Sequence, residues 1–244
     1  MKQISKLHKT NICEEEPVEF YLNSKHITTF MCTLQELREL AIGHLFSRGI
    51  IKNPLELATL AACEDMRKIY ASLDNNKNID GLDLGTLLTS NCGGAKFNDH
   101  LEEIRTISSD FQISILKIRH LMADMHANAT MYKTIGGMHC AAVASKDSII
   151  TLSEDVGRHN AVDKVLGKTL FMEMDFTQSM ILTTGRISSD MILKAANASC
   201  PCIISRSIAT TLALELAEKL GITVIGRALS STPIVYNNKE RIAS

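Results

Sequence analysis

The chain has 244 residues, of which 45% are hydrophobic, and a formal net charge of -1 at pH 7. This length allows one large or two modest domains with a substantial core. The near-neutral charge argues against a general nucleic-acid binder, which normally carries a basic surplus. No apolar run approaches the roughly 20 residues of a membrane span, and the first residues lead to no signal-peptide core. We therefore expect a cytoplasmic globular protein without nucleic-acid or membrane partners.

The cysteine pattern indicates reduced thiols rather than disulfides. Seven cysteines are scattered without framework spacing, as expected in a reducing compartment. Cys13 lies in a polar tail with nothing to orient it. The other five thiols outside residues 74–99 fall in apolar contexts and are expected to be buried as small hydrophobes: Cys32, Cys63, Cys140, Cys200 and Cys202.

The amino-terminal part predicts a hairpin and then a helix. Residues 17–23 alternate like a strand, 23–25 read as a turn, and 27–32 form the returning strand. Thr33 and Glu36 have the spacing of a capping box for a helix that stops at Gly49. His44 in that helix is expected to be a packed residue rather than a ligand. Residues 54–72 fit either a strand or a helix.

A polar segment follows at residues 74–99, rich in Asn, Asp, Gly and Ser. This composition predicts a long, flexible surface loop, and long loops in compact domains tend to be functional. The loop contains Cys92, followed by Gly93 and Gly94. No helix start or fixed cation is evident to activate the thiol, so Cys92 is either functional or an incidental exposed cysteine. A helical pattern over 114–128 leads into the second half.

The densest polar cluster of the chain runs from Glu154 to Lys164. A β-branched segment precedes it, and apolar residues at helical spacing follow it, so the cluster marks a strand-to-helix junction. Gly157 permits a tight turn that places Arg158 and His159 on the first helical turn, where free backbone N–H groups favour an anion. The plainer alternative is a charged helix start with internal ion pairs.

From residue 130 onward, strand and helix patterns alternate. The expected strands are 135–144, 148–152, 179–184, 202–205 and 222–226, and the expected helices are 158–172, 188–198 and 209–220. This order predicts an α/β domain with a mainly parallel sheet. In such sheets ligands bind outside the carboxyl ends of the strands.

Three arginines occupy that position, each just after a predicted strand: Arg186, Arg206 and Arg227. Arg158 would add a fourth guanidinium to the same edge. Guanidinium groups suit bidentate contacts with phosphate. The sequence therefore predicts a binding site for a phosphate-bearing ligand.

The chain also has a partial match to the motifs of zinc deaminases, H-x-E and P-C-x-x-C. The match fails where the chemistry lies, because Ala141 replaces the acid/base glutamate and Ser205 replaces the second thiolate. A metal-dependent hydrolase would hold zinc through His139, Cys140 and Cys202. Because the glutamate and the second thiolate are missing, we expect no resident metal. We favour a pocket position for His139 over a core position.

The residues described above resemble those of the formate dehydrogenase accessory sulfurtransferase family. The matching segments of the second half are 134–139, 154–164, 184–188, 202–207 and 234–236, and those of the first half are 16–17, 40–45 and 49–51. The similarity spans roughly residues 16–242. Within it, the GRHNAVDK run of residues 157–164 is the most specific motif.

The resemblance implies a cytidine deaminase-like, three-layer α/β domain at residues 129–244, a smaller α+β region at 1–128, and a homodimer. It implies a sulfurtransferase that accepts persulfide sulfur from a cysteine desulfurase. The sulfur would pass to the molybdenum bis-guanine dinucleotide cofactor before its insertion into formate dehydrogenase, whose activity would require this protein. The alternatives are a cofactor-binding chaperone without sulfur transfer and the zinc-dependent hydrolase.

The resemblance also assigns site residues. The family's sulfur carrier lies in a Cys-Gly-x-Cys loop, which matches Cys92 but has Ala95 at the second cysteine. The guanine nucleotide would be held by the segment Thr232, Pro233, Ile234, Val235, Tyr236 and Asn237. His139, His159 and the strand-end arginines would complete the cofactor site.

Overall fold

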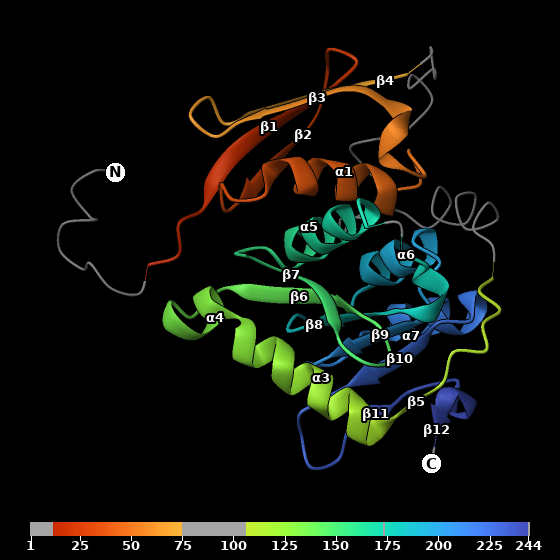
Figure 1. The fold of residues 1–244 in the computed structure, drawn as a ribbon. Helices are drawn as coiled ribbons and strands as arrows, with labels where there is room; N and C mark the ends of the chain where they lie inside the picture. The colour runs from red at the N-terminus through yellow and green to blue at the C-terminus, as the bar shows by residue number, and fades with distance from the viewer. Residues whose placement is uncertain (1–11, 75–105, 173, 244) are drawn as a thin grey trace.

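The computed structural model describes residues 12–74, 106–172 and 174–243 of the chain. These residues form three sheets, of four, six and two strands. The four-stranded sheet and helix α1 (Leu37–Ser47) lie on one side of the six-stranded sheet, separated from it by α5 (Arg158–Leu170), as Figure 1 shows.

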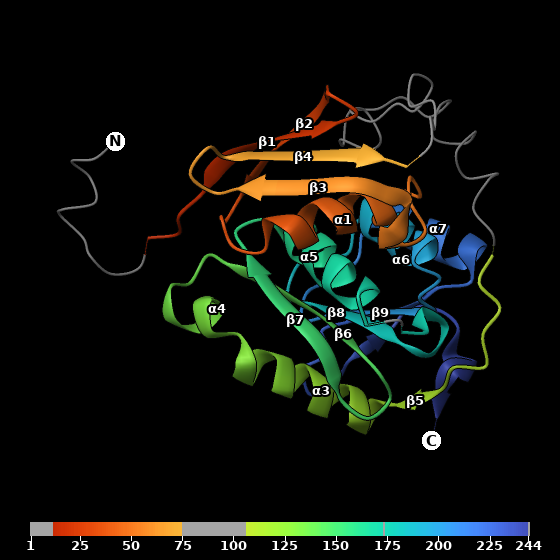
Figure 2. The ribbon, with the colours of Figure 1, turned by 45° about the horizontal axis from the view of Figure 1, so that its top comes forward.

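The four-stranded sheet has the order β2-β1-β4-β3. Its first two strands, β1 (Glu16–Leu22) and β2 (Lys25–Cys32), form the expected hairpin. Asn23 and Ser24 make the turn with φ values of 49° and 66°, the left-handed conformation that tight hairpins require. Residues 54–72 resolve as a short 3-10 helix (Pro54–Glu56), β3 (Leu57–Cys63) and β4 (Lys68–Leu73). Figure 2 shows this sheet lying across α1.

Helix α1 begins differently from the capping-box prediction. The residue before the helix is Glu36, in a left-handed conformation with φ 58° and without a side-chain cap. Thr33 instead donates hydrogen bonds to Asp155 Oδ2 from its backbone N (3.1 Å) and its Oγ1 (3.0 Å). The prediction was wrong because the helix begins only at Leu37, after Glu36, so the Thr33 hydroxyl does not accept from its first N–H groups and instead donates to a buried carboxylate from a distant strand.

The six-stranded sheet has the order β11-β10-β9-β8-β6-β7. Its strands are β6 (His139–Ala144), β7 (Ile149–Asp155), β8 (Met180–Thr183), β9 (Cys202–Ser205), β10 (Thr223–Gly226) and β11 (Ile234–Val235). The expectation of a mainly parallel sheet is correct only for β8, β9 and β10. β6 is antiparallel to both of its neighbours, and β11 is antiparallel to β10. Residues 145–148 join β6 to β7 by a tight turn, and such a short connection permits only antiparallel pairing.

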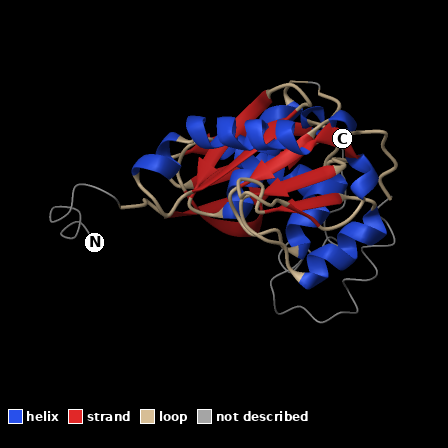
Figure 3. Cartoon of the chain, turned by 90° about the horizontal axis from the view of Figure 1, so that it is seen from below, coloured by secondary structure: helices blue, strands red, loops and turns tan. Residues whose placement is uncertain are grey.

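Helices cover both faces of this sheet (Figure 3). One face packs against α5, α6 (Ser189–Asn197) and α7 (Thr211–Leu220). The other packs against α3 (Ile115–Asn128), whose sequence predicts an apolar stripe of Leu116, Ile118, Leu121, Met122 and Met125; the last four are buried, whereas Leu116 is exposed. The short helix α4 (Thr130–Thr134) follows α3, and the two-stranded sheet pairs β5 (Ile113–Ser114) with β12 (Ile242–Ala243). None of the helices in the described ranges is long and apolar enough to cross a membrane.

Helices α1 and α5 pack with their backbones in contact. A Cβ atom added to Gly43 would lie 1.7 Å from the carbonyl oxygen of Asp163, and one added to Gly167 would lie 2.0 Å from that of Glu39. Residues of the amino-terminal sheet, α1, α5 and the six-stranded sheet therefore share one buried cluster. The division at residue 128 stays a prediction; α3, which it assigns to the first part, packs on the second sheet.

Candidate ligand-binding edge and its buried support

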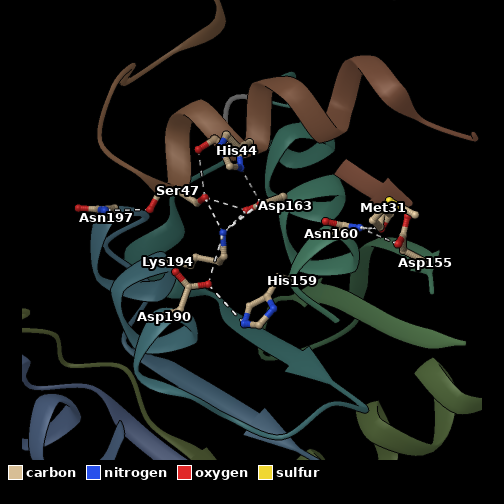
Figure 4. Close-up of polar contacts among 10 residues, drawn as sticks. All are labelled: Met31, His44, Ser47, Asp155, His159, Asn160, Asp163, Asp190, Lys194 and Asn197. Atoms are coloured by element: carbon tan, nitrogen blue, oxygen red, sulfur yellow. Dashed lines mark hydrogen bonds and ion pairs between the residues drawn. The ribbon is translucent and has the colours of Figure 1, made fainter. Parts of the chain in front are cut away.

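The GRHNAVDK segment begins where β7 ends, and its inner side chains form a buried ion pair. Lys164 Nζ lies 2.6 Å from Asp155 Oδ2, and both side chains are fully buried. Lys164 also donates to Thr33 Oγ1 at 2.7 Å. Asn160 Nδ2 donates to Asp155 Oδ1 at 3.0 Å and to the backbone oxygen of Met31 at 2.7 Å. The Asn160 contacts, drawn in Figure 4, join the start of α5 to the amino-terminal hairpin.

A second buried pair involves Asp163, the residue of α5 that precedes Lys164. Lys194 Nζ of α6 lies 2.8 and 3.0 Å from the two carboxylate oxygens of Asp163, and Ser47 Oγ donates to Oδ1 at 2.7 Å. His44 Nδ1 of α1 lies 3.4 Å from Oδ2. Burial acts to raise the pKa of Asp163, but Lys194 and His44 outweigh it and hold that pKa well below its usual range. Three helices therefore meet at one carboxylate.

His44 is the packed helix residue that the sequence predicted. It is buried, and its ring packs edge-on against Phe20 and Phe30. Burial lowers its pKa to about 4, although Asp163 acts in the opposite direction. His44 is therefore neutral at pH 7.

The polar cluster thus divides into two parts. The alternative of internal ion pairs is correct for Lys164 with Asp155; Asn160 hydrogen-bonds the same carboxylate, and Asp163 pairs outside the cluster with Lys194. Arg158 and His159, on the first turn of α5, are only partly buried and lie beside the carboxyl ends of the central strands.

The strand-end arginines lie where the sequence placed them. Because β8, β9 and β10 are parallel, Arg186, Arg206 and Arg227 follow strand ends on the same edge of the sheet, and all three are exposed. Arg158 reaches this edge from α5 and packs on Gly185, where an added Cβ would lie 2.7 Å from Arg158 Cβ. Burial, and then the charge of Arg186, lower the pKa of Arg158. Four guanidinium groups on one edge form a surface suited to phosphates.

A pocket of about 440 Å³ opens beside two of these arginines. It is lined by His126, Arg206, Arg227, Leu229 and Ser230. The Arg206 guanidinium hydrogen-bonds the hydroxyl of Tyr132 and lies 5.8 Å from the centre of its ring. Ser230 Oγ is buried without a hydrogen-bond partner among the described residues. The pocket therefore offers two cations and an unused hydroxyl to a ligand.

Sequence reasoning missed His126 and Ser230 in this pocket and Tyr132, which contacts Arg206. His126 lies in the last turn of α3 and Tyr132 lies in α4, on the face of the sheet that α3 covers. No local pattern marks either residue, because their approach to the strand ends depends on how α3 crosses the sheet. The arginines gave a local signal because each directly follows a strand.

His139 and His159 both lie near this edge, held by different partners. His139 Nδ1 is 3.3 Å from Thr184 Oγ1, which also accepts the backbone N–H of Cys140 at 3.0 Å. Burial and then Arg158 lower the pKa of His139. His159 Nε2 lies 3.4 Å from Ser188 Oγ and 3.4 Å from Asp190 Oδ2.

The carboxy-terminal segment 232–237 adds the edge strand β11 beside β10. The ring of Tyr236 packs on Gly226, where an added Cβ would lie 2.9 Å from Cε2. Asn237 accepts the N–H of Val224 at 2.8 Å and donates to the oxygen of Ile222 at 2.7 Å, so its side-chain amide serves the fold. Thr232 remains exposed, and Pro233, Ile234 and Val235 are half-buried.

Comparison with known proteins identifies the family. The model of the FdhD/NarQ family matches residues 13–243. The chain belongs to this family. It is 32% identical to "Sulfur carrier protein FdhD" of Bacillus subtilis (strain 168), over 98% of this chain and 93% of the relative. It is 33% identical to the protein of the same name from Shouchella clausii (strain KSM-K16), over 95% and 89%. The resemblance seen in the sequence is confirmed.

A solved structure has the same fold. The crystal structure of a formate dehydrogenase accessory protein from Desulfotalea psychrophila superposes with a TM-score of 0.77 at 28% identity. The match covers 95% of this chain and 90% of that one. The mixed α/β architecture is therefore that of a family member.

The thiols of this chain are of interest because the relatives are named sulfur carriers. Cys92 lies outside the described residues. Cys32, Cys140, Cys200 and Cys202 are buried, and burial raises the pKa of each thiol; for the first three it reaches about 12.

Two predictions about cysteines were wrong. Cys63 is only half-buried rather than part of the core, because it ends an outer strand of the four-stranded sheet. Cys13 is not without contacts, since its Sγ donates to the backbone oxygen of Gly136 at 2.9 Å. Within residues 12–74, 106–172 and 174–243, no three His, Cys, Asp or Glu side chains cluster closely enough to hold a metal ion.

Proposed function

We propose that this protein is a sulfurtransferase that delivers sulfur to a molybdenum bis-guanine dinucleotide cofactor before the cofactor is inserted into formate dehydrogenase. The observation that carries the proposal is the near full-length similarity to proteins named sulfur carriers. The structural relative described as a formate dehydrogenase accessory protein supports the identity of the acceptor. We place the protein in the cytoplasm as a homodimer, on a cytidine deaminase-like scaffold that no longer deaminates.

Cys92 is the proposed carrier, and a cysteine desulfurase is the proposed donor. The Cys92 thiolate attacks the terminal sulfur of the donor's persulfide, so that a new S–S bond forms on Cys92 and the donor cysteine leaves as a thiolate. The raised pKa values of the four buried thiols disfavour them for this role, because the thiolate is the nucleophile.

The arginine edge is the proposed site of the bound cofactor. Its diphosphate groups require several cations, which Arg158, Arg186, Arg206 and Arg227 supply. Among residues that the sequence did not suggest, His126 and Ser230 line the pocket beside Arg206 and Arg227. The exposed end of segment 232–237 would lie near the guanine, while Asn237 holds the strand.

Calorimetry with guanosine diphosphate tests the ligand site. We expect binding to the wild-type protein and a loss of roughly tenfold or more in affinity for Arg206→Ala and Arg227→Ala, since charge-assisted hydrogen bonds contribute about 1.5–3 kcal/mol. Lys219→Ala removes an exposed cation of α7 and should leave the affinity unchanged. No heat at millimolar nucleotide would contradict the site.

Incubation with a cysteine desulfurase and cysteine tests the chemistry. Peptide mass analysis should place one extra sulfur on the peptide that contains Cys92, and Cys92→Ala should not restore formate dehydrogenase activity in a strain that lacks this protein. An added sulfur on Cys140 or Cys202 would refute the carrier assignment.

The second candidate function is a cofactor-binding chaperone without sulfur transfer. The presence of Ala95 at the second cysteine position of the family motif favours it. Full complementation by Cys92→Ala, combined with guanosine diphosphate binding, would establish this alternative. Stoichiometric zinc in elemental analysis would instead favour a hydrolase.

A further inference from the structure

His159 has one ring nitrogen engaged and the other free for a ligand. Nε2 lies 3.4 Å from Asp190 Oδ2 (Figure 4). It also lies 3.4 Å from Ser188 Oγ. No residue in the described part of the chain forms a hydrogen bond with Nδ1. About 37% of the side chain remains exposed, at the edge of the sheet where the arginines gather.

The partners of Nε2 determine which ring nitrogen carries the proton. The contact with Asp190 Oδ2 is a charge contact at 3.4 Å. A carboxylate has no proton to donate and repels a lone pair that faces it, so Asp190 favours a proton on Nε2. The Ser188 hydroxyl can either accept from Nε2 or donate to it, and so does not decide between the two tautomers. In a neutral imidazole, a proton on Nε2 leaves a lone pair on Nδ1.

The carboxylate of Asp190 is itself held in place. Asp190 lies in the first turn of α6, where a negative charge is favoured by the helix dipole. Lys194, one turn later, lies 3.8 Å from Asp190 Oδ2 and is anchored by its buried pair with Asp163. His44 on α1 contacts the same Asp163 carboxylate. A series of polar contacts through Asp163, Lys194 and Asp190 thus connects α1 to His159.

We propose that Asp190 is a positioning residue that fixes His159 in its Nε2-protonated form, so that Nδ1 accepts a hydrogen bond from an N–H or O–H group of the ligand at the arginine edge. The ligand part of this inference rests on the proposed function, whereas the tautomer does not. Burial, opposed by Asp190, lowers the pKa of His159, which keeps the ring neutral at pH 7 and its lone pair available.

Nuclear magnetic resonance of protein labelled with ¹⁵N-histidine tests the tautomer directly. Long-range ¹H–¹⁵N correlations distinguish a protonated ring nitrogen from an unprotonated one, and loss of one signal set in His159→Gln assigns the ring. At pH 7.5 we expect His159 to be protonated at Nε2 in the wild type and to become a mixture of tautomers in Asp190→Asn and Asp190→Ala. A wild-type ring protonated at Nδ1, or variants with unchanged spectra, would overturn the proposal.

Guanosine diphosphate titration tests the consequence for binding. Loss of one neutral hydrogen bond should weaken the affinity of Asp190→Asn roughly three- to tenfold, and Asp190→Glu, which retains a carboxylate, should recover part of it. Glu215→Gln, an exposed acid on α7, is the matched control and should bind like the wild type. Equal affinities for wild type and Asp190→Asn would overturn the ligand role. If the wild type does not bind at all, the proposed function fails while the tautomer measurement still stands.

Discussion

Lys164 and Asp155 form an ion pair at 2.6 Å with no solvent exposure on either side chain. The pair links the first turns of α5 to the end of the strand that precedes the helix. Thr33, which belongs to the amino-terminal half, forms hydrogen bonds with both residues. The pair therefore fixes the direction in which α5 leaves the sheet, and with it the positions of Arg158 and His159.

Breaking this pair should destabilise the protein strongly. Lys164→Met leaves Asp155 as an unpaired buried carboxylate, and losses of this kind cost about 3–5 kcal/mol. Urea unfolding followed by circular dichroism measures the change. Lys168→Met on the same helix breaks a half-exposed pair with Glu36 and should cost less than about 1 kcal/mol. Equal losses in the two variants would contradict the structural role of Lys164.

The contact between α1 and α5 should tolerate no side chain at Gly43. The Cβ of Gly43→Ala would overlap the carbonyl oxygen of Asp163, and because that oxygen belongs to a helix backbone, the two helices must separate. We expect a loss of about 3 kcal/mol, at the upper end of the range for overpacking. Gly136→Ala meets no atom within 4 Å but has φ +71°, so it should lose only about 1 kcal/mol. Thermal or urea unfolding of both variants tests this difference.

The stability of the protein should fall as the pH drops from about 6.5 to about 4. Burial holds the pKa of His44 at about 4 in the folded protein, below its ordinary value of 6.5. As the pH falls through this window the unfolded chain takes up the proton first, so the folded state loses stability. The contribution of His44 alone is a loss of about 3 kcal/mol.

The variant His44→Gln separates this contribution from others. His159, whose pKa is lowered in the same direction, should keep part of the slope in the variant. Asp163, with a pKa below its ordinary 3.8, contributes stability that is lost only below about pH 3.8. Free energies of unfolding measured at pH 7 and pH 4.5 should therefore differ less in His44→Gln than in the wild type; an unchanged difference would refute the assignment.

The described thiols should differ sharply in reactivity. Cys140, Cys200 and Cys202 are buried with raised pKa values, so the native protein should resist their alkylation at pH 8. Cys13 and Cys63 are partly accessible and should react at least tenfold faster, since only accessible thiolate reacts. Timed iodoacetamide labelling with peptide mass analysis gives the rates, and a urea-unfolded sample provides the control in which all sites react.

Local sequence patterns predict the individual strands, helices and turns and the residues that directly follow them. The hairpin turn at Asn23, the start of α5 after Gly157 and the position of Arg186 just past a strand follow from short-range rules of turn geometry and periodicity. The family resemblance likewise follows from the order of residues, above all the GRHNAVDK run. Such features depend on neighbours within a few positions, so one strand or helix is enough to specify them.

Contacts between distant segments decide which polar groups stabilise the fold and which remain available to a ligand. Lys164 and Asp163 have the same residue types as catalytic groups, and they are structural because Thr33, Lys194 and His44 reach them from distant parts of the chain. Where such segments meet depends on which of their faces can be buried together. That choice is set by the free energy of burial summed over the whole core. A short stretch of sequence therefore does not reveal which distant segments come into contact.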